Sequence, residues 1–220
     1  HLSTIGIQSI AVVHQDSPFG KSNLTTCEEL AADHKVKVLK ALPVAIAAED
    51  AKAQAAELIA LKPGAVVMIM AGRQVEVFMR DYRASGAGAP LYTISVGITD
   101  AAGSAKRLEG KLAGLVTASI VPPPKAIRVP IVADYQQDRA AFGGKIDSYT
   151  ALEGYIVARV MVEGLVRGGR ALTRDSFIAG LESIGRTSFG GFPVEYSARN
   201  HNGSSYVDLE MYTSDGQLRR

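Results

Sequence analysis

The fold is decided by residues 10–22, which read IAVVHQDSPFGKS: a short apolar strand, a loop of small and polar residues, and the start of a helix. The same arrangement recurs along the first 120 residues, with strands predicted at Ile10–Val13, Val36–Leu39, Ala65–Met70 and Leu91–Ile94. Because a helix joins each strand to the next, right-handed crossovers and parallel strands are expected. The sequence therefore predicts an open α/β sheet, which binds ligands at the carboxyl ends of its strands.

The predicted helices each carry one apolar face, as expected of helices that cover a sheet. The first is predicted from Ser22 to His34, and the third is marked by Val75, Phe78, Met79 and Tyr82. The second is marked by Ala51, Ala55, Leu58 and Ile59.

Composition narrows the class of partner. The 220 residues are 47% hydrophobic and carry 24 basic against 22 acidic side chains, a net charge of +2. This balance, without runs of like charge, argues against nucleic-acid and anionic-membrane binding and favours small-molecule partners. The single cysteine, Cys27, excludes an internal disulfide, and the start at His1 looks cut.

The second half of the chain lacks the regular alternation of strands and helices that is predicted for the first half. A fifth apolar run, Leu115–Ile120, leads to Pro122–Pro124, where we expect the chain to cross between domains. A polar stretch at residues 135–139 is followed by two helices, one with Tyr149 and the other starting at Thr173. Turns are predicted at Asn202-Gly203 and at Ser214-Asp215-Gly216. Between them Val207–Met211 is predicted as a strand at a sheet edge, which returns to the first sheet.

Catalytic and cofactor motifs do not fit. Phe19-Gly20-Lys21-Ser22 resembles the end of a phosphate-binding P-loop, but Gln15 stands where that motif needs glycine. The four histidines lack metal-ligand spacing, and no Gly-x-Ser-x-Gly sequence presents a nucleophile. We therefore expect a protein that is not an enzyme and uses no cofactor or metal.

The candidate site consists of the residues that follow the strands. These are Asp16 to Gly20, Ala71-Gly72-Arg73 and Ser95-Val96-Gly97. Small residues allow a ligand to approach the backbone, and amides at a helix start favour anions. The alternatives are ordinary turns at Gly72 and Gly97, a Phe19 packed on its own domain, and a solvated Arg73.

Taken together, these features resemble the type I periplasmic solute-binding proteins of ABC importers, especially the branched-chain amino-acid (Leu/Ile/Val-binding protein-like) group. The resemblance rests on the strand followed by Asp16-x-x-Phe19-Gly20, the prolines after the fifth strand and Ser148-Tyr149-x-Ala151. Phe189-Gly190-Gly191 and Asp215-x-Gln217 near the end add to it. It covers nearly the whole chain.

The resemblance implies two Rossmann-like α/β lobes that close on a ligand. On that plan, residues 1–121 and 205–220 form the second lobe, and residues 122–204 form the returning part of the first. The leading, N-terminal half of the first lobe has no counterpart here, so the 220 residues are expected to be a fragment. Its uncovered helices are expected to cause self-association.

The implied function is capture of an amino acid or related small organic acid in the periplasm, after secretion, for delivery to an ABC permease. The alternatives are a ligand-sensing domain of a receptor or an amide-type regulator with the same fold, and an α/β enzyme whose catalytic residues lie in the missing part. Neighbouring permease and ATPase genes would favour transport, and kinase or antiterminator genes would favour sensing.

By resemblance, the ligand-binding positions are Phe19, Ala71, Gly72, Arg73, Ser95, Val96, Gly97 and Tyr149. Amino-acid binders of this family commonly place an acidic residue near Val96 to neutralise the ligand's ammonium. Val96 cannot do so, and Arg73 adds positive charge. We therefore expect a carboxylate rather than a standard α-amino acid, unless Glu76 or Asp100 takes the acidic role. The family's α-carboxylate ligands lie mainly in the missing half-lobe.

Overall fold

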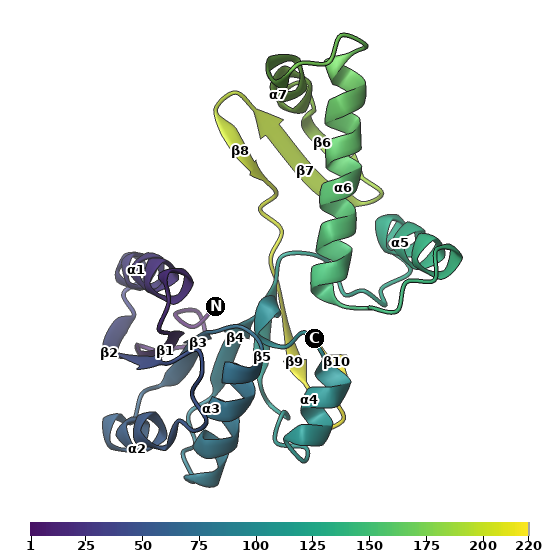
Figure 1. Cartoon of the computed structure of the whole chain (residues 1–220). Helices are drawn as coiled ribbons and strands as arrows, with labels where there is room; N and C mark the ends of the chain where they lie inside the picture. Colours follow the sequence, from purple (N-terminus) through teal and green to yellow (C-terminus); the bar gives the residue numbers. More distant parts are fainter. Residues whose placement is uncertain (220) are drawn as a thin grey trace. The chain divides into compact units, whose positions relative to one another are not determined.

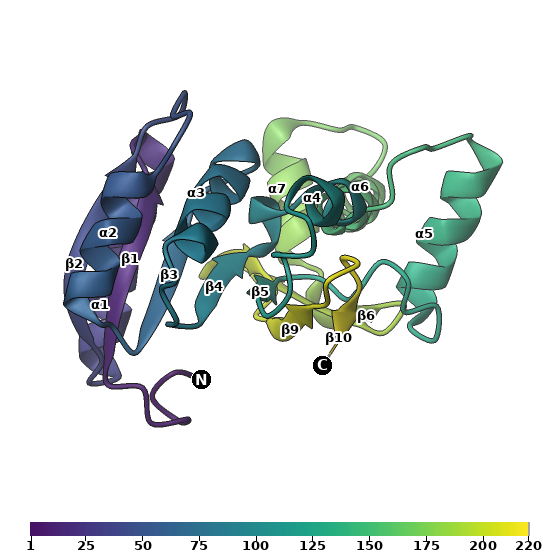
Figure 2. The same ribbon diagram turned by 90° about the horizontal axis from the view of Figure 1, so that it is seen from below.

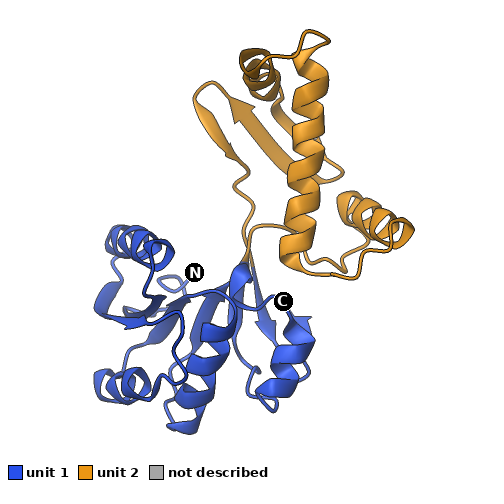
Figure 3. Ribbon diagram, in the orientation of Figure 1, with its two compact units in different colours: residues 1–118, 209–220 blue, residues 119–208 orange. Residues whose placement is uncertain are grey.

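A computed structural model describes residues 1–219, and the chain divides into two compact units. Unit 1 comprises His1–Ala118 and Leu209–Arg220, and unit 2 comprises Ser119–Asp208 (Figure 3). The chain thus leaves unit 1 and returns to it at the end.

Unit 1 is built on a seven-stranded sheet with the order β10-β9-β5-β4-β3-β1-β2 (Figure 2). The strands are β1 (Ser9–Gln15), β2 (Lys37–Val44), β3 (Ala65–Ile69), β4 (Leu91–Ile94), β5 (Val116–Ser119), β9 (Asp208–Tyr212) and β10 (Leu218–Arg219). The pairs β1–β2, β1–β3, β3–β4 and β4–β5 are parallel, which confirms the predicted α/β fold class.

The terminal strand returns to the first sheet, as predicted, but it is not the edge. β9 lies between β5 and the short strand β10, with which it pairs antiparallel. The chain reverses at residues 214–216, as predicted, and the residues after this turn form β10, the outer strand.

The helices of unit 1 cover both faces of its sheet. α1 (Pro18–Asp33) contributes Leu24, Cys27 and Ala31 to the core on one face. α2 (Lys52–Leu61), α3 (Arg73–Ala84) and α4 (Ala101–Arg107) cover the other (Figure 1). Strand β1 shows the division, since Ile10 and Val12 belong to the first core and Ala11 and Val13 to the second.

Helix α1 starts at Pro18, not at Ser22 as predicted. The Ser17 side chain accepts a hydrogen bond from the Gly20 amide at 3.3 Å, and Pro18 occupies the first helical turn, where its missing N–H costs nothing. A Cβ at position 20 would overlap the carbonyl oxygen of Gln15, so only glycine lets the helix start this close to β1. Residues 18–21, which the sequence predicted to lie in the loop after β1, therefore form the first turn of α1.

Unit 2 contains α5 (Pro130–Ala141), α6 (Tyr149–Gly168) and α7 (Arg174–Glu182). Its antiparallel sheet has the order β6 (Gly185–Phe189), β7 (Phe192–Ser197) and β8 (Asn200–Gly203). Ser148 and Thr173 cap α6 and α7, so both predicted helices are confirmed.

Unit 2 contains one helix that the sequence did not predict, and one predicted turn is wrong. The polar stretch at residues 135–139 lies inside α5, because Ile131, Val132 and Tyr135 form a buried face that the polar residues obscure. Asn202 and Gly203 lie in β8 rather than in a turn. Among residues 1–219, no helix has the length and apolar character needed to cross a membrane.

Candidate functional site

The carboxyl ends of β1, β3 and β4 meet at one edge of the unit 1 sheet, because these strands are parallel neighbours. From β1 the chain continues to β2 on one side and then crosses to β3 on the other. The strand order thus reverses beside β1, and ligands of open α/β sheets bind outside the strand ends at such a point.

A pocket of about 330 Å³ lies at this edge. Its lining comprises Gly72, Arg73, Glu76, Gly97, Thr99, Asp100 and Arg107. Three of the predicted ligand-binding residues, Gly72, Arg73 and Gly97, therefore lie together in one pocket. They come from the loops after β3 and β4.

Backbone geometry joins these two loops. Gly72 has φ +65°, a left-handed conformation that favours glycine, and it immediately precedes α3. Its amide donates to the carbonyl oxygen of Val96 at 3.3 Å. Val96 belongs to the single turn of 3-10 helix Ser95–Gly97, in which Ser95 and Gly97 are buried and Val96 is half-buried. Ala71 is also half-buried.

The acidic side chains of the pocket already have partners. Arg107 donates to Glu76 through Nε at 2.8 Å and through Nη2 at 2.7 Å, and the Ser104 hydroxyl donates to the same carboxylate at 2.7 Å. The hydrogen bonds from Arg107, with the smaller contribution of Ser104, hold the pKa of Glu76 below its usual range. This carboxylate remains ionised, with its charge directed at Arg107.

The side chain of Asp100 caps the start of α4. Its side chain accepts from the Gly103 amide at 3.0 Å, and Arg107 Nη1 lies 3.5 Å from its other oxygen. Neither acidic residue considered for binding an ammonium group is therefore free of a cationic neighbour.

Arg73, the first residue of α3, is exposed and pairs with Glu49 at 2.9 Å. Both side chains are largely accessible, at 68% and 77%, so this pair is weak and can exchange for another anion. Of the two pocket cations, Arg107 donates hydrogen bonds to Glu76, whereas Arg73 pairs with Glu49 and acts on Glu76 only through its charge, which makes a smaller contribution to the lowered pKa of Glu76.

The remaining predicted site residues are not in the lining of this pocket. Phe19 is the second residue of α1 and is 38% exposed, next to the loop where Lys21 pairs with Asp16 at 2.8 Å. Tyr149 belongs to unit 2, where it starts α6 and is buried.

Sequence reasoning missed Thr99 and Arg107 as lining residues. Arg107 ends the short helix α4, which carried no periodic apolar signal, and its partner Glu76 lies 31 positions earlier. Among residues 1–219 there is no group of three or more His, Cys, Asp or Glu side chains placed to hold a metal ion.

Known proteins of one family resemble the chain over nearly its whole length. The profile of the periplasmic binding protein family matches residues 2–217. The chain belongs to this family. Proteins of the family are solute-binding proteins of the periplasm or cell exterior and are generally not enzymes. A search of curated protein sequences returned no significant match.

Solved structures of family members share the fold. A substrate-binding periplasmic protein from Ralstonia solanacearum is 28% identical, with a TM-score of 0.84 over 99% of this chain and 62% of its own. A possible leucine/isoleucine/valine-binding protein from Rhodopirellula baltica SH 1 is 22% identical, with a TM-score of 0.86, over 100% of this chain and 61% of its own.

A third relative is an ABC transporter solute-binding protein from R. palustris in complex with benzoate. It is 19% identical, with a TM-score of 0.80, over 99% of this chain and 59% of its own. The present chain thus spans about three fifths of the length of these relatives.

Proposed function

We propose that the protein captures a small organic carboxylate and delivers it to the permease of an ABC importer. The observation that carries this proposal is the strand-end pocket of unit 1, in a chain that belongs to the periplasmic binding protein family. Such a protein works by binding and release in the periplasm, so the proposal requires no catalytic group.

The charge of the pocket supports a carboxylate without an ammonium group. An α-amino acid needs an acceptor for its ammonium, because an unpaired buried charge is costly. Glu76 is engaged by Arg107 and Ser104, and Asp100 caps α4. Arg73 and the positive end of α3, whose N-cap residue Gly72 provides no capping side chain, instead favour an anion. The benzoate complex of the R. palustris relative is a precedent for this ligand class.

Calorimetry with the full-length protein tests the ligand class directly. We expect benzoate or 4-methyl-2-oxopentanoate, the keto acid of leucine, to bind at least about tenfold more tightly than leucine, a difference of about 1.4 kcal/mol. A preference for leucine that is lost in Glu76→Ala or Asp100→Ala would contradict the charge argument. Turnover of any of these compounds would contradict the binding function.

Arg73→Gln examines the proposed cation. We expect carboxylate affinity to fall about tenfold or more, because a charge-assisted hydrogen bond contributes about 1.5–3 kcal/mol. Lys111→Gln is the matched control, since Lys111 is exposed and is not in the lining of the pocket. Equal effects of the two substitutions would indicate a general charge effect.

A further inference from the structure

Arg73 of the strand-end pocket is paired with a carboxylate from another segment of unit 1. Residues 45–51 join β2 to α2, and within them Glu49 Oε2 lies 2.9 Å from Arg73 Nη2. Glu49 is not in the lining of the pocket, whereas Arg73 is. Glu76, the other carboxylate near Arg73, is already hydrogen-bonded to Arg107 at 2.8 Å. Glu49 is therefore the acceptor that a ligand has to replace at Arg73.

Helix α3 holds the backbone of Glu49 beside Arg73. Arg80 Nη2 donates to the carbonyl oxygen of Glu49 at 2.9 Å, and the Asp81 carboxylate accepts from the Ala51 amide at 2.7 Å. Both Arg80 and Asp81 belong to α3, the helix that begins with Arg73. Because these contacts do not involve the Arg73 side chain, the Glu49 backbone stays in place when a ligand binds Arg73. The Glu49 carboxylate can then return to Arg73 by rotation of its side chain alone.

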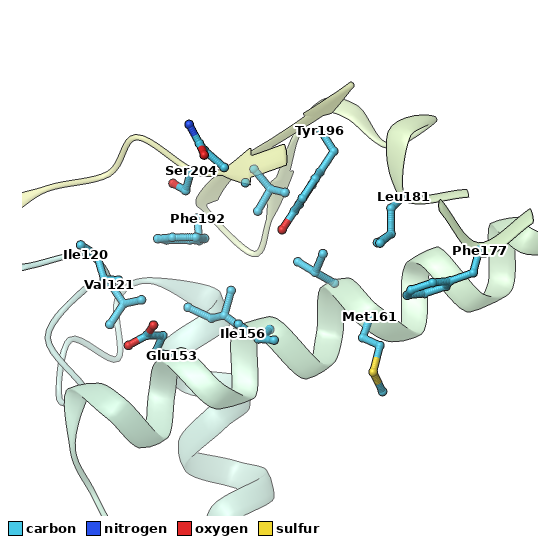
Figure 4. A pocket seen from close by; sticks show the side chains of 15 residues that line it. Ile120, Val121, Glu153, Ile156, Met161, Phe177, Leu181, Phe192, Tyr196 and Ser204 are labelled. Atoms are coloured by element: carbon cyan, nitrogen blue, oxygen red, sulfur yellow. The ribbon is translucent and has the colours of Figure 1, made fainter. Parts of the chain in front are cut away.

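A second pocket, of about 310 Å³, lies within unit 2 and differs in charge (Figure 4). Its lining comes mainly from α6, α7 and β7 and includes the aromatic side chains of Phe177, Phe192 and Tyr196. Among the residues that the structure describes, Glu153 is the one charged residue of this lining. Of these two pockets, that of unit 1 is therefore the one that offers a carboxylate a cation.

We propose that Glu49 competes with the ligand carboxylate for Arg73 and thereby weakens ligand binding. The inference rests on the proposed function, because it takes Arg73 as the cation that binds the ligand. Both side chains of the pair are mostly exposed, so the pair contributes little stability and a ligand can displace Glu49. A protein that delivers its ligand must also release it, and a competing carboxylate beside the site assists that release.

Calorimetry on the full-length protein with benzoate and 4-methyl-2-oxopentanoate tests the competition. Glu49→Gln should tighten binding about three- to fivefold, since fivefold corresponds to about 1 kcal/mol, the upper value for an exposed ion pair. Glu29→Gln is the matched control, because Glu29 is an exposed residue of α1, which covers the opposite face of the sheet from α3. This control removes the same charge and should change the affinity by less than about twofold.

A second background separates competition for Arg73 from a general effect of charge. In Arg73→Gln, the additional Glu49→Gln substitution should change the affinity by less than about twofold, because no guanidinium remains at this position to compete for. An unchanged or weaker affinity in Glu49→Gln alone, or an equal gain in both backgrounds, would overturn the proposal and leave the proposed function intact. Absence of carboxylate binding by the unmodified protein would contradict that function and the competition with it.

Discussion

Replacing Asp81 by alanine should destabilise the unit that carries the strand-end pocket. Asp81 lies in α3, and its Oδ2 accepts a hydrogen bond of 2.7 Å from the backbone amide of Ala51, directly before α2. Ala51 is completely buried, and Asp81 is 7% exposed. The carboxylate thus supplies the partner that the Ala51 amide cannot obtain from water.

The magnitude follows from the amide left unpaired. A buried donor without a partner costs about 1–3 kcal/mol, and a hydrogen bond to a charged group contributes about 1.5–3 kcal/mol. We expect Asp81→Ala to lower the free energy of unfolding by about 2–3 kcal/mol. At about 2–4 °C per kcal/mol, the melting temperature should fall by about 5–10 °C.

Two further variants separate the hydrogen bond from the ion pair. Asp81→Asn keeps an acceptor oxygen and should cost less, about 1 kcal/mol. Arg80→Gln removes the cation 2.8 Å from Oδ1, but the Arg80 side chain is half-exposed, so its loss should cost less than about 1 kcal/mol. Thermal unfolding followed by circular dichroism measures all three. A loss below about 0.5 kcal/mol in Asp81→Ala would refute the reasoning.

Because of the Asp81 carboxylate, we expect the free energy of unfolding to depend on pH. Arg80, with a smaller contribution from the Ala51 amide, lowers the pKa of Asp81 in the folded state. A lowered folded pKa stabilises the protein above the unfolded value of about 3.9, and that stability is lost as pH falls through this value toward the folded one. Asp81→Asn should lack this part of the acid destabilisation.

Three other substitutions test particular contacts. Arg107→Gln should raise the pKa of Glu76 toward its ordinary value, because the hydrogen bond from Arg107 is the largest cause of the lowered pKa. An NMR titration of the Glu76 carboxyl carbon measures this pKa, and an unchanged pKa in the variant would contradict the prediction. Gly97→Ala should reduce stability by about 1–3 kcal/mol in thermal unfolding, since the new Cβ would lie 2.5 Å from the Thr93 hydroxyl; an unchanged melting temperature would show that the loop relaxes. Gly180→Ala should cost more than about 2 kcal/mol in the same assay, because its Cβ would lie 2.5 Å from the Gly164 carbonyl oxygen of α6, and a smaller loss would mean that α6 and α7 can separate.

The sequence by itself determined that the strands of the first sheet are parallel. Apolar runs such as Ala65–Met70 alternate with helices of one apolar face, and both periodicities are local properties of the chain. The ends of the strands mark the loops that follow them. Because the carboxyl ends of parallel strands share one edge of a sheet, Gly72, Arg73 and Gly97 could be predicted to lie near one another. The resemblance to the family rested on other motifs, among them the Asp16-x-x-Phe19-Gly20 loop and the prolines after the fifth strand.

Tertiary structure decided the elements whose local signals conflict or are weak. Residues 135–139 of α5 are mostly polar, and only the structure shows that Tyr135 is buried. Strands β6 and β8 show no apolar alternation of their own, and both pair with β7, the strand that buries Phe192 and Val194. Helix α4 is too short for its periodicity to be recognised.

Tertiary structure also decided the electrostatics of the pocket. The sequence offered Glu76 and Asp100 as free acids, and only the packing of α3 beside α4 brings Arg107 within 2.8 Å of Glu76. Coulomb energies and hydrogen bonds depend on distances of a few ångströms between residues distant in the chain, and no local pattern encodes those distances.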